Sequence, residues 1–165
     1  MNSVKPYGLE VKNAPAYWSQ GILWTILASS EQTGGLFSLM EELRSKNSGP
    51  LPHTHEQDEA LYIIEGQITL IAGAEKITAK AGALAYIPAR CVHSFRVDTQ
   101  ETRILNFYFP GGFESVPTKF GVPAKSRTLP PPNLKAPGTP EQMRTLFKRV
   151  GMVPLALPDV LRETR

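Results

Sequence analysis

The sequence predicts an all-β fold, a jelly-roll barrel followed by a Pro-rich arm and a short C-terminal helix. Between residues 22 and 109, short runs rich in β-branched and aromatic residues recur with Gly- and Pro-containing turns between them. No helical pattern interrupts these runs, so a parallel sheet with crossover helices is not expected. Many short antiparallel strands must close into a barrel or pack as two sheets to protect their edges, and the jelly roll is the eight-stranded solution that we expect.

The strands can be placed from these runs. Each begins and ends near turn residues such as Thr-Gly-Gly, Ser-Gly-Pro, Glu-Gly and Lys-Ala-Gly. In chain order, we expect strands at residues 22–28, 35–43, 60–66, 67–73, 75–80, 83–88, 92–97 and 103–109.

The part of the chain after residue 109 has a different composition. Eight prolines between positions 110 and 140 predict an extended arm that wraps the barrel. Thr139 then has the features of a helix N-cap, with Pro140 at the first helical position and Gln142 completing a capping box, and Gly151 is expected to end the helix. The last nine residues, LPDVLRETR, are expected to add a short helical turn. We therefore expect a barrel with an N-terminal extension over 1–112 and an arm and helix over 113–165, together forming a single domain.

Composition limits the classes of protein to which this chain can belong. The chain has 165 residues, 41% of them hydrophobic and 20% charged, which is typical of one globular domain and not of a disordered protein. Its first residues lack the apolar core of a secretory signal, and it contains no apolar run long enough to span a membrane, so a cytoplasmic location is expected. Cys91 is the single cysteine and cannot form an intramolecular disulfide.

The net charge of +3 does not indicate a nucleic-acid partner. Residues 1–110 hold nine Lys and Arg against eleven Asp and Glu, and the remainder holds nine against four. The basic residues of the C-terminal part are scattered, without the clustering or interleaved aromatic residues of a nucleic-acid site. We interpret them as a solvated surface.

The segment PLPHTHEQDEALYIIEG, residues 50–66, contains the candidate site. Alternate side chains of an extended segment point to the same face, so His53, His55 and Glu59 share one side. His93, the third and last histidine of the chain, lies in a later expected strand and can close the group if the sheets fold back on each other. Two or three imidazoles and a carboxylate on one face form a metal-ligand set, whereas the alternative is an exposed polar loop.

Other acidic side chains and the thiol near these residues are alternative candidates for the site. Glu56 and Asp58 have the opposite parity to Glu59 and are expected to face solvent, although either could replace it as a ligand because loop geometry before a strand is loose. Glu65 is expected in the turn with Gly66. Cys91 shares parity with His93 and could face the cavity, but packing is the expected role of its side chain.

These residues also resemble a known family. His53-x-His55-x3-Glu59-x6-Gly66 is similar to the first cupin motif, and Gly82-x5-Pro88 followed by His93 is similar to the second. From about residue 21 to residue 151, the chain resembles single-domain cupins described as quercetin 2,3-dioxygenase-like. The resemblance implies a metal held by His53, His55, Glu59 and His93.

Two positions depart from the second motif. Arg90 stands where the motif has glycine, and Val97 stands where it has asparagine. A glycine would permit a positive φ in the turn, so Arg90 implies a different turn or a strained one. The four ligand positions are intact.

The ligand types do not determine which metal ion binds. Neutral imidazoles with one carboxylate suit first-row divalent ions, and Fe, Mn, Ni, Co, Cu and Zn all remain open. Strand parity predicts an apolar pocket wall from Leu61, Ile63 and Phe95, with Phe107 and Tyr108 as further candidates for either the wall or the core.

The resemblance implies an activity, a metal-dependent dioxygenase that cleaves a flavonol-like or other enolisable phenolic substrate, with O2 as the second substrate and Glu59 as the general base. Two alternatives share the same barrel. One is a cupin that binds a metal or small molecule without turnover, as a sensor or accessory protein. The other is an O2-independent metal isomerase, lyase or cyclase. We also expect a homodimer, because the strand edges near the N-terminus and the arm offer surface for pairing.

Overall fold

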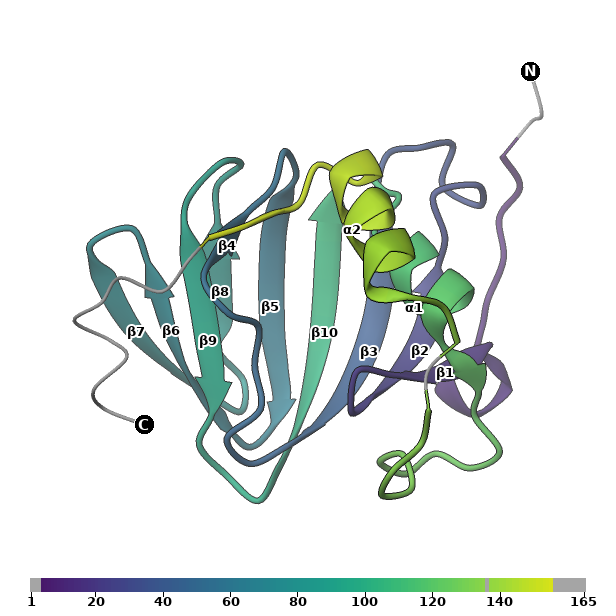
Figure 1. Cartoon of the computed structure of the whole chain (residues 1–165), viewed down its shortest axis with the longest axis horizontal. Coiled ribbons are helices and arrows are strands. Elements are labelled where there is room, and N and C mark those ends of the chain that lie inside the picture. Colours follow the sequence, from purple (N-terminus) through teal and green to yellow (C-terminus); the bar gives the residue numbers. More distant parts are fainter. Residues whose placement is uncertain (1–3, 136, 156–165) are drawn as a thin grey trace.

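Two antiparallel β-sheets face each other in the computed structural model, which describes residues 4–135 and 137–155 (Figure 1). The seven-stranded sheet has the order β11-β1-β2-β3-β10-β5-β8, and the five-stranded sheet has the order β12-β4-β9-β6-β7. The first consists of β1 (Ala16–Ser19), β2 (Ile22–Ala28), β3 (Ser38–Ser45), β5 (Asp58–Glu65), β8 (Leu84–Ile87), β10 (Glu101–Phe109) and β11 (Val122–Pro123). The second consists of β4 (His53–Thr54), β6 (Gln67–Ala72), β7 (Glu75–Lys80), β9 (His93–Val97) and β12 (Val153–Pro154). This arrangement confirms the predicted all-β jelly roll.

Each of the eight expected runs forms a strand, with ends that move by up to three residues. The pattern did not indicate β1, β4, β11 and β12, which have four residues or fewer, because such short segments form through pairing with neighbours. It also did not indicate the helix α1 (Ser115–Phe120) inside the Pro-rich arm. That helix buries Val116, Pro117 and Phe120, so tertiary packing compensates for its weak helical pattern.

The main apolar core fills the space between the two sheets. It is formed by inward-facing residues of β5, β6, β7, β8, β9 and β10: Leu61, Ile63, Ile68, Leu70, Ala79, Ala85, Ile87, Phe95, Val97 and Ile104. A second apolar cluster lies on the seven-stranded sheet, beside the five-stranded one. Here α1 and α2 (Pro140–Arg149) pack against β2, β3 and β10 (Figure 1). A boundary between two apolar clusters therefore crosses the inner face of the larger sheet.

The helix α2 begins as the sequence predicts. The Thr139 hydroxyl accepts a hydrogen bond from Gln142 N at 3.2 Å, and Gln142 Oε1 accepts one from Thr139 N at 2.8 Å, which completes the capping box. Gly151 follows the helix with φ +74°, and the chain then turns into β12 beside β4. The helical turn expected in the last nine residues lies outside the described residues. No helix in the described part of the chain has the length and hydrophobicity needed to cross a membrane.

Candidate metal centre

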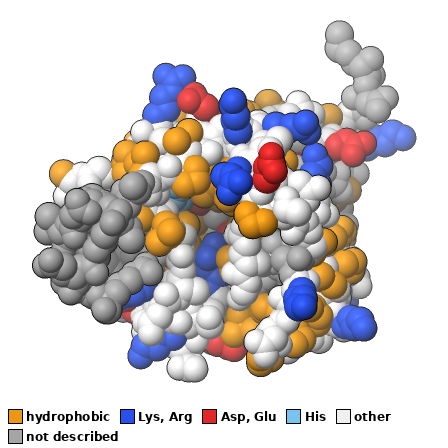
Figure 2. Space-filling view, viewed as in Figure 1, with side chains coloured by type: hydrophobic (Ala, Val, Ile, Leu, Met, Phe, Trp, Pro, Cys, Tyr) orange, Lys and Arg blue, Asp and Glu red, His pale blue; other side chains and the backbone are white. Residues whose placement is uncertain are grey.

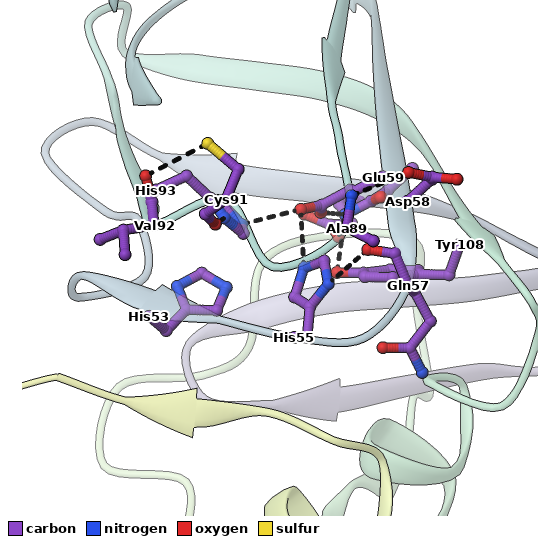
Figure 3. A network of polar contacts seen from close by, with 12 residues as sticks. His53, His55, Gln57, Asp58, Glu59, Ala89, Cys91, Val92, His93 and Tyr108 are labelled. Carbon is purple, nitrogen blue, oxygen red and sulfur yellow. Dashed lines mark hydrogen bonds and ion pairs between the residues drawn. The ribbon is translucent and has the colours of Figure 1, made fainter. Parts of the chain in front are cut away.

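Three histidine side chains meet between the sheets. His53 on β4 lies directly opposite His93 on β9, and His55 follows two residues after His53. The ring centroids are 4.1 Å apart for His53 and His93, 4.9 Å for His55 and His93, and 5.5 Å for His53 and His55. One ring nitrogen from each histidine lies within 4.8 Å of the others, and all three side chains are buried (Figure 3). The spacing and burial are those of a metal-binding cluster.

Backbone carbonyls orient all three rings. The Nδ1 atoms of His53, His55 and His93 lie 2.9 Å from the carbonyl oxygens of Leu51, Gln57 and Cys91, respectively. A carbonyl oxygen can only accept a hydrogen bond, so each Nδ1 carries the proton. In the neutral ring, Nε2 is then left with a free lone pair, which is the arrangement that metal-ligating histidines adopt.

Glu59, at the start of β5, adds a carboxylate to the cluster. Its Oε2 lies 3.3 Å from His55 Nε2 and 3.0 Å from His93 Nε2. Ligand atoms bound at about 2.1 Å to one ion and at right angles to each other are separated by about 3 Å, so these distances suit shared coordination. His93 Nε2 is buried and forms no well-oriented hydrogen bond with any residue that the structure describes, so a buried polar atom is left for a ligand. The residues present fit a divalent transition-metal ion.

The ionisation of the cluster agrees with this interpretation. Burial would raise the pKa of Glu59, but the imidazoles of His55 and His93 outweigh it and hold that pKa well below its usual value. Burial lowers the pKa of His93, but the Glu59 carboxylate raises it more. Burial and the nearby His93 lower the pKa of His53 to about 4. At neutral pH, the cluster therefore contains an ionised carboxylate and an uncharged His53, both ready to act as ligands.

A network of buried polar side chains holds the Glu59 carboxylate on the side away from the imidazoles. Asn106 on β10 donates from Nδ2 to Glu59 Oε1 and to Glu42 Oε1, both at 2.8 Å, and lies 3.2 Å from the Tyr108 hydroxyl. Glu42 in turn accepts a hydrogen bond from Arg44 Nε. Burial and the carboxylates of Glu59 and Glu42 raise the pKa of Tyr108 well above its usual value, so its hydroxyl stays protonated. This network fixes one carboxylate oxygen of Glu59 and leaves the other facing the imidazoles.

A cavity of about 220 Å³ opens onto the cluster, and Figure 2 shows the face of the molecule hollowed near its centre, with hydrophobic side chains around the hollow. His53 and Glu59 are the members of the cluster that line it. Its apolar lining is Ile22, Trp24, Phe95, Phe113, Phe147 and Met152, and its polar lining includes Arg44, Asn106 and Tyr108. Phe147 comes from α2 and Met152 from the segment after it, so the C-terminal part of the chain forms one wall of the cavity.

The structure places the residues predicted for the pocket wall in different surroundings. Phe95 lines the cavity, but Leu61 and Ile63 do not, because both lie deeper in the core between the sheets and are fully buried. Phe107 also lies elsewhere, since its ring packs beside those of Phe37 and Phe109. Its neighbour Tyr108, which points to the other face of β10, lines the cavity instead.

Glu56, Asp58 and Cys91 make their side-chain contacts outside the histidine cluster. Glu56 is exposed and pairs with Arg90 at 2.8 Å. Asp58 accepts hydrogen bonds from the Tyr86 hydroxyl and Ala89 N, so it does not take part in the cluster. The Cys91 side chain packs against the main core.

Several functional residues were not predicted from the sequence. Glu42 and Arg44 in the run MEELR have the polar character of solvent-facing strand residues, yet both are buried. Both lie on the same face of β3 as Met40, and Asn106 lies on the same face of β10 as Tyr108. The signal that could have found them is this shared parity, which places them on the inner face of a sheet.

The departures from the second motif have local explanations. Val97 is fully buried in the main core. Arg90 has φ +64°, the left-handed conformation that a glycine would adopt freely, and its N donates to His55 O at 2.8 Å. The turn is therefore retained with a strained residue at this position.

Arg90→Gly is expected to raise the free energy of unfolding by roughly 0.5 to 1 kcal/mol, because the left-handed strain of a side chain exceeds the entropy cost of glycine. The Arg90 and Glu56 side chains are both mostly exposed, so loss of their ion pair costs little. Urea denaturation measures the difference, with Arg90→Ala as the control that loses the ion pair but keeps the strain. A loss of stability greater than about 1 kcal/mol in Arg90→Gly would contradict this account.

A larger hollow of about 330 Å³ lies between α1 and α2, away from the histidines. It is open and lined by Phe120, Leu146 and five polar or charged side chains: Lys119, Glu141, Gln142, Thr145 and Arg149. The buried cluster and its smaller cavity are the better candidate site because ligand-type side chains converge there.

Comparison with known proteins gives the following similarities. Residues 39–108 match a family model described as a cupin domain. The chain is 29% identical over 126 residues to quercetin 2,3-dioxygenase of Bacillus subtilis (strain 168), an alignment that covers 76% of this chain and 37% of that protein. The chain therefore spans little more than a third of the length of this relative.

Solved structures support the fold. An RmlC-like cupin from Shewanella frigidimarina NCIMB 400 superposes with a TM-score of 0.59 at 12% identity, covering 67% of this chain and 96% of that one. The polyketide cyclase RemF from Streptomyces resistomycificus superposes with a TM-score of 0.56 at 19% identity, covering 76% and 88%. At these identities the similarity concerns the fold.

Proposed function

We propose that the histidine cluster holds a catalytic metal and that the protein is a dioxygenase acting on a flavonol-like or other enolisable phenolic substrate, since residues 39–108 match a cupin domain model and three imidazoles converge between the sheets. The observation that carries the proposal is the orientation of the three imidazoles, whose Nδ1 atoms are all occupied by backbone carbonyls. The similarity to a quercetin 2,3-dioxygenase supports the choice of reaction.

His53, His55, His93 and Glu59 would hold one divalent ion, and their donor types admit Fe, Mn, Ni, Co, Cu or Zn. Such an ion, when bound, supplies Lewis acidity that lowers the pKa of a substrate hydroxyl. Four protein ligands on one side leave room for a small molecule on the side of the cavity.

Glu59 is the residue that we assign to proton transfer. Its carboxylate is ionised, and Oε2 faces the centre of the cluster, where it can accept the proton of a substrate hydroxyl, either while it is a ligand of the ion or when it is loosened from it. Asn106 holds Oε1 by a hydrogen bond of 2.8 Å, so the carboxylate keeps its orientation while it accepts the proton. The aromatic walls of the cavity favour an unsaturated substrate.

Metal analysis followed by oxygen measurement tests the proposal. Protein purified without added metal is expected to contain about one transition-metal ion per chain by elemental analysis, and a panel of phenolic compounds is expected to include one that drives oxygen consumption in an oxygen electrode. Product formation under anaerobic conditions would instead favour an isomerase, lyase or cyclase. Binding of metal or ligand without any product would favour a sensor or accessory protein. The cytoplasmic location and the homodimer stay predictions.

A further inference from the structure

Arg44 is a buried cation beside the metal cluster that the proposed reaction does not use. It lies on β3 with a side chain that is 6% exposed, and it lines the same cavity as His53 and Glu59. A buried arginine of this kind needs hydrogen-bond partners, because an unpaired charge is costly to keep away from water.

The guanidinium has unused donors. Its Nε donates to Glu42 Oε2, but Nη1 and Nη2 donate to no residue in the described ranges 4–135 and 137–155. The Cζ atom lies 4.9 Å from the Phe95 ring centroid and 5.5 Å from that of Trp24, so two aromatic rings hold the guanidinium in place. Two terminal nitrogens at the wall of a cavity match the paired oxygens of a carboxylate.

The charges around the cavity leave one positive charge unbalanced. Arg44 contributes +1, the carboxylates of Glu42 and Glu59 contribute −2, and a divalent ion held by uncharged imidazoles would contribute +2. The sum is +1, and a ligand with a single negative charge would balance it. Without the ion the sum is −1, so in stripped protein a preference for an anion rests on the unused donors of Arg44 alone.

The cavity also limits the size of the ligand. Its volume of about 220 Å³ lies below the roughly 300 Å³ at which pockets for drug-sized ligands begin, so a one-ring molecule fits better than a three-ring flavonol. Trp24, Phe95, Phe113 and Phe147 supply aromatic surface around this space.

From these observations we infer that Arg44 binds an anionic group of the substrate, and that the substrate class is a compact aromatic or unsaturated carboxylate. The carboxylate pairs with Nη1 and Nη2 of Arg44 while the ring lies between the aromatic walls. This inference rests on the proposed function, because it assigns the same cavity as the substrate site. It narrows the proposed substrates from flavonol-like and other enolisable phenols to compact acidic ones.

The test compares 2-hydroxybenzoate with 2-hydroxybenzamide, which has the same shape without the charge. Isothermal titration calorimetry measures both affinities in protein loaded with Zn²⁺ and in protein stripped with EDTA. The wild type is expected to bind the carboxylate more tightly than the amide in both states, by at least tenfold in the Zn²⁺-loaded protein, where the charge count favours an anion. Arg44→Met, which keeps the unbranched stem of the side chain and removes the guanidinium, is expected to reduce this ratio to within twofold of one in stripped protein.

Matched variants keep the test decisive. Arg96→Met removes an exposed arginine on β9, which pairs with Asp98, and is expected to leave the ratio unchanged. Glu42→Gln/Arg44→Met removes both buried charges and replaces Arg44→Met if the single variant does not fold. A wild-type ratio within twofold of one in stripped protein, or a ratio that survives the loss of Arg44, would overturn the inference. Elemental analysis of the same samples reports separately on the metal, so a protein without metal that keeps its preference in the stripped state would overturn the proposed function alone.

Discussion

His93→Ala is expected to reduce bound metal from about one ion per chain to below about a tenth of that value after desalting. Removal of a residue that only orients a ligand already costs roughly 10- to 100-fold in metal affinity, and loss of a ligand is expected to cost more. His93 is central to the cluster, since its Nε2 is 3.0 Å from Glu59 Oε2 and its ring is 4.1 Å from that of His53. Elemental analysis of the purified variant measures the effect.

Cys91→Ser is the matched control for His93→Ala. Cys91 lies two residues away, contributes its backbone carbonyl to His93 Nδ1 and packs its side chain outside the cluster, so this variant is expected to keep its metal. Circular dichroism of both variants verifies that they fold. Full metal occupancy in folded His93→Ala would count against the ligand set.

Glu59→Gln is expected to lower kcat by roughly 10²- to 10⁴-fold, the usual contribution of a general base. The amide of glutamine cannot take up the substrate proton, yet it fills the same volume, and its oxygen can accept the hydrogen bond that Asn106 donates to Glu59 Oε1. The three imidazoles remain, so much of the metal should be retained. Steady-state oxygen consumption with the phenolic substrate found by screening, together with metal content, separates these two effects.

The control for Glu59→Gln is Glu56→Gln, which removes an exposed carboxylate three residues away that pairs with Arg90. Its activity is expected to stay within about twofold of the wild type, because its charge is screened by solvent. If folded and metal-loaded Glu59→Gln turned over at the wild-type rate, another group would have to accept the proton.

Much of the fold follows from local patterns in the sequence. The runs from β2 to β10 alternate or cluster apolar residues between clear turns, and the turn at Gly66 requires a glycine because a Cβ there would lie 2.4 Å from Thr102 Oγ1. The capping box at Thr139 fixes the start of α2. In contrast, β11 and β12 have two residues each and exist because neighbouring strands pair with them, which local pattern cannot reveal.

Strand parity predicts which side chains lie on the face that holds the candidate site. It does not predict how far along the barrel each of them lies. Alternation along the strand places His53, His55 and Glu59 on one face, and the structure brings them together with His93. Parity also places Leu61 on that face, but it does not tell how far along the barrel a side chain lies, and Leu61 belongs to the core.

The polar residues behind the site show a second limit. Glu42, Arg44 and Asn106 are residue types that are mostly exposed in proteins, so each one read singly suggests solvent. They are buried because they hydrogen-bond to one another or to Glu59, and such a network depends on the pairing of β3 with β10. Long-range pairing of this kind is a tertiary property.

The most direct test is a crystal structure of the metal-loaded protein with anomalous diffraction data. We expect one anomalous peak between the sheets, about 2.0 to 2.2 Å from Nε2 of His53, His55 and His93 and from one Glu59 oxygen. Absence of a peak at these residues from fully loaded crystals, or a peak coordinated by other side chains, would contradict this ligand set.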